Sequence, residues 1–224
     1  MSISNLRNRR SPSHTKAALS GLMIAVLLGA GITLAHAADG DADGIPDAAE
    51  VLLGTDPLVA DTNGNGKNDK DDDTPLVMAN PIPQTGKPSP LTFLSGIIEN
   101  NVEPGNSKAA DDHLELVIKN TSTTDIAGLT SFLTIKDDVA GTFENYFRKL
   151  PGVAIKAGQE ITLHFDTKGS TDFAAVTDRF RSNPNSSLYK SPNPKTLTVQ
   201  IATGGFAPAT LDIHRDKGGA ETAD

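Results

Sequence analysis

Two clusters of acidic side chains near the N-terminus have the types and spacing needed to bind a metal ion. In the first, carboxylates fill positions 1, 3, 5, 9 and 12 of a twelve-residue segment with glycine at position 6: Asp39, Asp41, Asp43, Asp47 and Glu50. This is the spacing of an EF-hand loop, in which alternate side chains and the position-7 carbonyl, here Ile45, point at one Ca²⁺ ion. Because five carboxylates in so short a segment repel one another, we expect the loop to depend on a cation for its order.

The same spacing returns 22 residues later, in a segment with fewer charges. The corresponding positions hold Asp61, Asn63, Asn65, Asp69 and Asp72, and Lys67 would supply the position-7 carbonyl. Two asparagines replace carboxylates, and an aspartate side chain is one methylene shorter than the glutamate that closes the first loop. We therefore expect this second site to bind calcium more weakly and to accept Mg²⁺ as readily.

Gly54-Thr55-Asp56-Pro57 lies between the two loops. With this linker, residues 39–72 resemble the thrombospondin type 3-like repeats of bacterial exported proteins, in which D-x-D-x-D-G loops are joined by G-T-D-P. The resemblance implies calcium binding by the residues given above, in a compact unit that forms around the metal. The asparagines and Asp72 depart from the pattern. Paired EF-hands and dockerins need longer helices, whereas Gly54 and Pro57 allow only a short helix over about Ala48–Leu53. An acidic linker without specific metal binding stays open as the alternative.

The first 37 residues have the pattern of a signal peptide. Four basic residues precede an apolar run over residues 17–34, and Ala35-His36-Ala37 has the small-x-small form of a cleavage site. We expect cleavage after Ala37 and a mature form that is secreted, periplasmic or at the cell surface and does not span the membrane. An uncleaved membrane anchor is the alternative.

Charge and composition narrow the classes of partner. The chain of 224 residues has a net charge of −8 and no cysteine, which excludes disulfides and thiolate chemistry. Loss of the signal peptide removes four positive charges, so the mature chain is more negative still. Because phosphate binding needs clusters of Lys and Arg, we expect cations as partners and no nucleic acid.

Short alternating patterns after residue 90 predict an antiparallel, Ig-like β-sandwich of seven or eight strands. We expect the signal peptide at 1–37, calcium-binding repeats at 38–74, a Pro-rich extended linker at 75–90 and the sandwich at 91–224. The segment Thr171–Arg181 has the pattern of a short helix, and turns are expected at sites such as Pro151-Gly152. The clearest strand patterns cover Leu114–Lys119, Ile161–Asp166, Leu197–Ile201 and Leu211–His214, and weaker ones cover Leu91–Ile98, Leu129–Ile135 and Thr142–Arg148.

No catalytic motif is present, so we expect a non-enzymatic protein; an unmarked carboxylate pair of a hydrolase is the alternative. The favoured function is an exported calcium-binding structural or adhesion protein with an extracytoplasmic protein or matrix partner. Two other binding functions remain open. Carbohydrate binding would need an aromatic platform, and the chain has no Trp and two Tyr. Transition-metal binding would need His113, His164 and His214 on one sheet.

Overall fold

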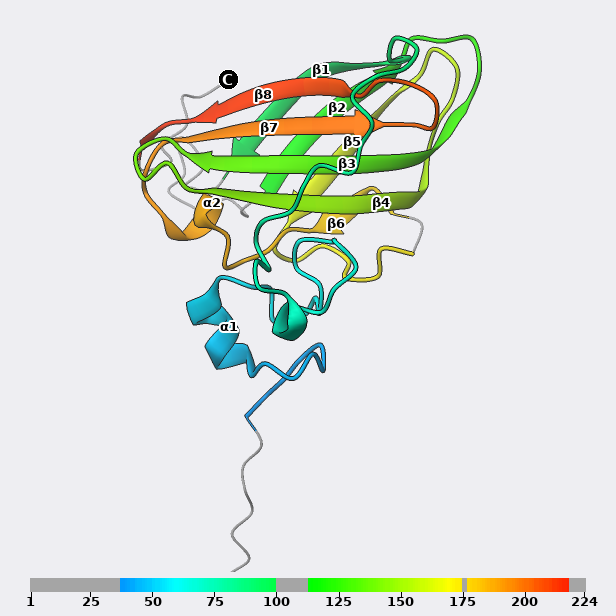
Figure 1. Ribbon diagram of the computed structural model, residues 1–224. Coiled ribbons are helices and arrows are strands. Elements are labelled where there is room, and N and C mark those ends of the chain that lie inside the picture. The colour runs from blue at the N-terminus through cyan, green and yellow to red at the C-terminus, as the bar shows by residue number, and fades with distance from the viewer. Residues whose placement is uncertain (1–36, 100–112, 175–176, 218–224) are drawn as a thin grey trace, which may run out of the picture. The chain divides into compact units, whose positions relative to one another are not determined.

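The alternating apolar patterns form the strands of two facing sheets (Figure 1). The computed structural model describes residues 37–99, 113–174 and 177–217. The elements in chain order are α1 (Asp47–Leu53), η1 (Asp69–Asp71), β1 (Leu91–Glu99), β2 (His113–Asn120), β3 (Ile126–Asp137), β4 (Phe143–Ile155), β5 (Glu160–Asp166), β6 (Arg179–Arg181), α2 (Ser187–Lys190), β7 (Lys195–Ala202) and β8 (Ala209–Arg215).

One sheet has the strand order β1-β2-β5-β6 and the other has the order β4-β3-β7-β8. All pairings are antiparallel except that of β6, a strand of three residues that runs parallel to β5. The first, second and fifth strands share one sheet, and the third, fourth, seventh and eighth share the other. An immunoglobulin-type sandwich divides its strands in this way. The predicted mainly-β sandwich is confirmed.

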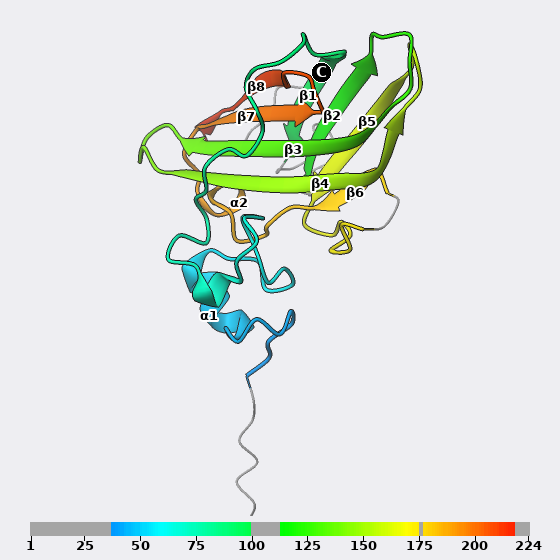
Figure 2. The same cartoon turned by 45° about the vertical axis from the view of Figure 1, so that its right-hand side comes forward.

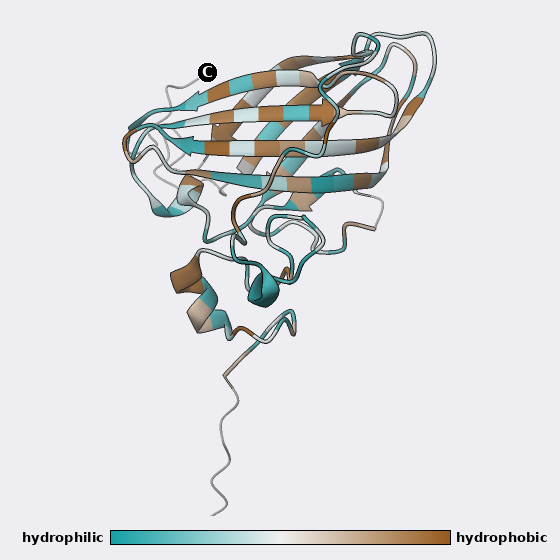
Figure 3. Ribbon diagram, viewed as in Figure 1, coloured by the Kyte–Doolittle hydropathy of each residue, from teal (hydrophilic) through white to brown (hydrophobic). Residues whose placement is uncertain are grey.

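Hydrophobic and hydrophilic residues alternate along the strands, as the banded colours of Figure 3 show, and the buried hydrophobic ones of both sheets form the core. In β2, Leu116 and Ile118 are fully buried, as is Leu163 in β5. From the opposite sheet, Leu197 and Val199 of β7 join the same buried cluster. Burying each such side chain contributes roughly 1.5–3 kcal/mol, so this cluster is the main source of the domain's stability.

The short helix expected at Thr171–Arg181 is wrong. The described part of this segment contains no helix, and its end is β6. Phe180 explains the difference, because its side chain is fully buried and its ring centroid lies 5.4 Å from that of Phe165. Packing against the core thus overrides the local helical pattern.

The turn expected at Pro151-Gly152 is also wrong, since both residues lie inside β4. The register of the β3–β4 pair shifts between Ala127 and Leu129, opposite these residues. A proline is tolerated there because β4 is an edge strand. At the register shift, the pairing of the strands also does not require the N–H that proline lacks.

The Pro-rich segment is extended and lies on the outer face of the β4-β3-β7-β8 sheet (Figures 1 and 2). Ile82 is buried against Phe132 and Ala202. The side chains of Asn80 and Gln84 bond that of Gln200 on β7 at 2.7 and 3.1 Å. The segment therefore forms a fixed cover on this sheet.

The described residues from Ala37 onward belong to one compact unit. The predicted signal peptide, except for Ala37, lies outside the described residues. None of the helices in the described ranges has the length and apolar character needed to cross a bilayer.

Candidate metal centre

The helix α1 places Glu50 at the first acidic loop. Pro46 precedes the helix with an extended backbone, and Gly54 ends it in the left-handed conformation (φ 86°), with its N–H donating to the carbonyl of Glu50 at 2.7 Å. A proline before and a glycine after a helix are typical boundaries. The helix directs Glu50 inward, and the side chain of Glu50 is fully buried.

Side-chain bonds to the backbone set the winding of the first loop. Oδ2 of Asp39 accepts from the N–H of Gly44 at 3.1 Å, and Oδ1 of Asp41 accepts from the N–H of Asp43 at 3.1 Å. Oδ1 of Asp43 accepts from the N–H of Ile45 at 2.6 Å. Gly44 adopts a φ of 92°, a conformation that favours glycine.

The second loop repeats this winding position by position. Oδ2 of Asp61 accepts from the N–H of Gly66 at 2.8 Å, and Gly66 also has a φ of 92°. Oδ1 of Asn63 accepts from the N–H of Asn65 at 2.9 Å, and Oδ1 of Asn65 accepts from the N–H of Lys67 at 2.8 Å. The two segments recognised by their spacing thus have the same local hydrogen bonding.

Carboxylates gather in two overlapping groups among the described residues. One group comprises Asp39, Asp41 and Asp43, and the other comprises Asp43, Glu50 and Asp69. In each group, one oxygen per residue lies within 4.8 Å of the others. The second group joins the two loops, because Asp69 belongs by spacing to the second.

The carboxylates of the first loop lack the partners that buried acids need. One oxygen each of Asp41, Asp43 and Glu50 is buried without a hydrogen bond. Within the described ranges, no lysine or arginine forms an ion pair with them. An unpaired buried charge costs several kcal/mol, and oxygen-rich sites of this kind suit a hard divalent cation such as Ca²⁺.

The raised pKa values of these acids also indicate a cation site. Burial, and then repulsion from Asp41, raises the pKa of Glu50 to about 7. Burial also raises the pKa of Asp41 and, despite hydrogen bonds from Thr62, that of Asp69. Full ionisation of these acids is therefore unfavourable without a metal ion, and a bound cation would make it favourable.

Asp47, predicted as a position-9 ligand, is outside both groups. Its Oδ1 accepts from the N–H of Gly40 at 2.7 Å, and its N–H donates to the carbonyl of Ala38 at 2.8 Å. The side chain thus secures the start of the first loop.

Asp72, the predicted last ligand of the second loop, already has hydrogen-bond donors. Its Oδ2 accepts from the amide nitrogens of Asn63 and Asn65 at 3.1 and 2.7 Å. The N–H of Thr74 is the main cause that lowers the pKa of Asp72. The position-3, position-5 and position-12 side chains of this loop converge as the spacing predicts, with their polar groups bonded to one another.

The sequence did not reveal the residues that join the repeat to the sandwich. Nε of Arg181 donates to Oδ2 of Asp56 at 2.7 Å, in a pair that is almost completely buried. The amide nitrogens of Asn183 and Asn185 donate at 2.7 Å to the carbonyls of Gly54 and Thr55. The G-T-D-P linker was the available signal, because its polar residues lie outside the ligand positions of both loops.

The edge strand β4 also contacts the repeat. The N–H of Phe147 donates to the carbonyl of Asn63 at 2.8 Å, and the N–H of Asn145 donates to the carbonyl of Leu76 at 2.8 Å. Nη2 of Arg148 donates to the carbonyl of Thr62 at 2.7 Å. The second loop and the residues after it therefore cover donors that an edge strand would otherwise expose.

The three histidines do not share one sheet. His113 and His164 lie on the neighbouring strands β2 and β5, whereas His214 lies on β8 in the other sheet. Nδ1 of His164 is 3.8 Å from Glu115, and Nδ1 of His214 is 3.2 Å from the hydroxyl of Thr196. This arrangement gives no support to a single site made by all three.

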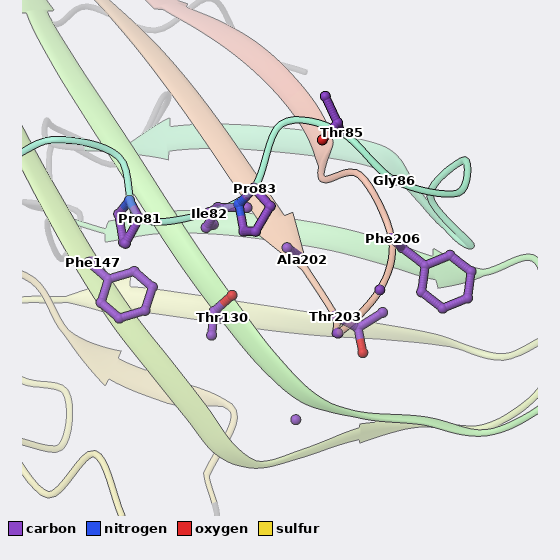
Figure 4. A pocket seen from close by; sticks show the side chains of 13 residues that line it. Pro81, Ile82, Pro83, Thr85, Gly86, Thr130, Phe147, Ala202, Thr203 and Phe206 are labelled. Carbon is purple, nitrogen blue, oxygen red and sulfur yellow. The ribbon is translucent and has the colours of Figure 1, made fainter.

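A pocket of about 410 Å³ lies where the Pro-rich segment meets the sheet. Figure 4 shows the residues around it, which come from this segment, from β3, β4 and the end of β7, and from the turn between β7 and β8. Its lining includes the rings of Phe147 and Phe206 and the hydroxyl-bearing side chains of Thr85, Thr130 and Thr203.

Comparison with known proteins yields no family. No family model and no curated protein matches the sequence. Solved structures with similarity include a β-glucuronidase 2 from Bacteroides uniformis (12% identity, TM-score 0.30, covering 57% of this chain and 12% of that one). Others are a β-glucuronidase of glycoside hydrolase family 2 (15%, TM-score 0.33, 57% and 13%) and an alkylpurine DNA glycosylase of Pseudomonas fluorescens (11%, TM-score 0.31, 57% and 31%). The chain thus corresponds to a minor part of each of these proteins, at a similarity that carries no functional argument.

Proposed function

We propose that this chain is an exported calcium-binding structural or adhesion protein, in which calcium stiffens an N-terminal acidic repeat attached to a β-sandwich. The observation that carries the proposal is the set of buried carboxylate oxygens of Asp41, Asp43 and Glu50 that lack any hydrogen bond. Calcium would supply the positive charge that these oxygens lack, since it accepts about six to eight oxygen ligands.

The contacts of α1 extend this effect to the sandwich. The hydroxyl of Thr55 donates to Oε1 of Glu50 at 3.2 Å, and the carbonyl of Thr55 accepts from Asn185 of the sandwich. A cation that holds Glu50 would therefore also hold the linker that contacts β6 and the residues after it. The expected result is a rigid repeat fixed on one end of the domain.

Exposed apolar side chains support the interaction part of the proposal. Leu52 of α1 is 88% exposed, and Val51, Leu53 and Leu58 are each about half exposed. These four side chains, which lie within eight residues of one another in sequence, are the apolar surface of the repeat that a partner would cover.

Calorimetry on the processed chain, isolated after export, tests the proposal. Calcium should bind with measurable heat, and Asp43→Ala should abolish the tightest event. The melting temperature should rise with calcium and fall with chelator, because a ligand of the folded state stabilises it by mass action. Lys149→Ala, an exposed change on β4, is the control. No heat and no thermal shift at millimolar calcium would refute calcium binding, and an N-terminus other than Ala38 by mass spectrometry would refute the expected processing.

Carbohydrate binding is a second candidate, and the pocket of Figure 4 is the observation that favours it. Two phenylalanines and three threonines are among the residues that line a volume in the range of small-ligand sites. A glycan array probed with and without chelator tests this function. Calcium-independent binding that Phe147→Ala abolishes would support it, and the absence of any glycan signal would exclude it.

A further inference from the structure

The position of Asp69 differs from what its place in the second loop suggests. Its carboxylate is almost fully buried and lies within 4.8 Å, oxygen to oxygen, of Asp43 and Glu50 in the first loop. Sequence spacing assigns this residue to a site with Asp61 and Asp72, but neither of these residues shares its group.

Asp69 is held in this position by Thr62. The N–H of Thr62 donates to Oδ1 of Asp69 at 2.9 Å, and its hydroxyl donates to Oδ2 at 2.6 Å. Each carboxylate oxygen has a further lone pair, so these bonds leave it able to bind a cation. The same hydroxyl accepts from the N–H of Asp56 at 2.8 Å, which orients Thr62 in turn.

The first loop has a position to fill. Asp47, its own ninth residue, uses Oδ1 to accept from Gly40 and is absent from the carboxylate groups. Glu50, fully buried, and Asp43, 6% exposed, each have an oxygen without a partner. Asp69 therefore adds a carboxylate to Asp43 and Glu50 in a loop whose own position-9 residue is absent from the group.

We propose that Asp43, Glu50 and Asp69 bind one and the same calcium ion, so that the two loops share a single tight site. The second loop acts mainly as the donor of Asp69, since Asn63 and Asn65 already donate to Asp72, and Asp61 accepts from backbone N–H groups of its own loop. The inference rests on the proposed calcium-binding function and adds to it the composition and the number of tight sites. One ion would then bind the repeat together across residues that are 19 or more apart in sequence.

Matched substitutions in the second loop test the shared site. Calcium is titrated calorimetrically into the processed chain, into Asp69→Asn and into Asp72→Asn, and retained ions are counted by native mass spectrometry. We expect one tightly held ion in the unmodified chain. Asp69→Asn should weaken it by about tenfold or more, whereas Asp72→Asn should change it by less than about twofold, because only Asp69 is a ligand of that ion. A tight event that is unchanged in Asp69→Asn would overturn the shared site while leaving calcium binding itself intact. Absence of binding in the unmodified chain would instead refute the proposed function.

Hydrogen exchange on the unmodified chain gives a second test, which does not depend on whether a variant folds. At one equivalent of calcium, backbone protection should increase together in residues 39–50 and in residues 62–72. Protection of the first loop alone at one equivalent, with the second protected only at higher calcium, would show two separate sites and contradict the proposal.

Discussion

The guanidinium of Arg181 forms a bidentate ion pair with the carboxylate of Asp56: Nε donates to Oδ2 and Nη2 donates to Oδ1, each at 2.7 Å. The two residues are 125 positions apart in sequence, and both side chains are more than nine-tenths buried. A buried ion pair is stable only while both partners are present. The repeat and the sandwich should therefore unfold as one cooperative unit.

Replacing Arg181 by methionine should destabilise the protein by about 3–5 kcal/mol, because the Asp56 charge would stay buried without a partner. Chemical denaturation followed by circular dichroism measures the change. Lys136→Met is the control, since Lys136 pairs with Asp138 at 3.6 Å with its own side chain 59% exposed, and such surface pairs contribute about 0–1 kcal/mol. Equal losses in the two variants would show that the Arg181–Asp56 pair does not join the two parts.

Gly64→Ala should weaken the contact between the second loop and β4. A Cβ at this position would lie 2.1 Å from the carbonyl oxygen of Phe147, and the φ of 82° adds backbone strain. Gly158→Ala is a matched control, because Gly158 has a φ of 72° and open space around it. The control should lose roughly 1–2 kcal/mol from strain alone, and Gly64→Ala should lose more. Thermal unfolding in chelator measures both, and a smaller loss in Gly64→Ala would contradict the close approach.

Calcium affinity should fall as the pH is lowered below neutrality. Burial raises the pKa of Glu50 to about 7, so a proton competes with the cation below that pH. Affinity should decline by up to about tenfold per pH unit below 7, and Glu50→Gln should bind weakly with a flatter pH profile. Calorimetry between about pH 5.5 and 7.5 measures this; a constant affinity in the unmodified chain would contradict it.

The metal-free protein should show the opposite trend in stability. The pKa of Glu50 is higher in the folded chain than its ordinary value of 4.5, so the folded state binds more protons between these limits. Stability without calcium should therefore fall as the pH rises through that window. Urea unfolding in chelator at several pH values measures it, and stability that increases over the same range would argue against a buried, protonated Glu50.

Asp137 should contribute stability that is lost in acid. The N–H of Ala140, and also Lys195 at 2.9 Å, keep the pKa of Asp137 well below its ordinary value of 3.8. This contribution is complete above the ordinary value and disappears as the pH falls below it. Asp137→Asn should reduce the urea midpoint near neutral pH and approach the unmodified chain in acid.

Asp125→Asn is the control for this acid effect. The pKa of Asp125 is also lowered, mainly by Lys156, but its side chain is 53% exposed and its bonds are accessible to water. The change should have little effect on the urea midpoint. If it lowered the midpoint as much as Asp137→Asn does, the buried position of Asp137 would not be the cause.

The strands and the two loops were predictable because their signals are local. Alternation places Leu116 and Leu197 in the core without knowledge of which strands are neighbours. The loops follow from the spacing of their oxygen-bearing residues. The hydrogen bonds of Asp39 and Asp61 to the glycine at position 6 of each loop agree with this spacing.

Relations between distant residues were not predictable from one sequence. The spacing places Asp69 in its own loop, and only the fold brings it to Glu50. The segment ending in Phe180 has a helical pattern that packing against Phe165 overrides. Nothing in the local pattern around Arg181 indicates that its partner is Asp56.

The second loop supplies the carbonyl of Asn63 to the N–H of Phe147, and the next segment supplies that of Leu76 to Asn145. If loss of calcium loosened the repeat, β4 would become an open edge with free donors, able to add a strand from another molecule. Calcium would then decide whether the chain stays soluble by itself or aggregates edge to edge. Light scattering after chelation, compared with Gly64→Ala in calcium, would reveal such association, and unchanged scattering would show that the edge stays covered without the ion.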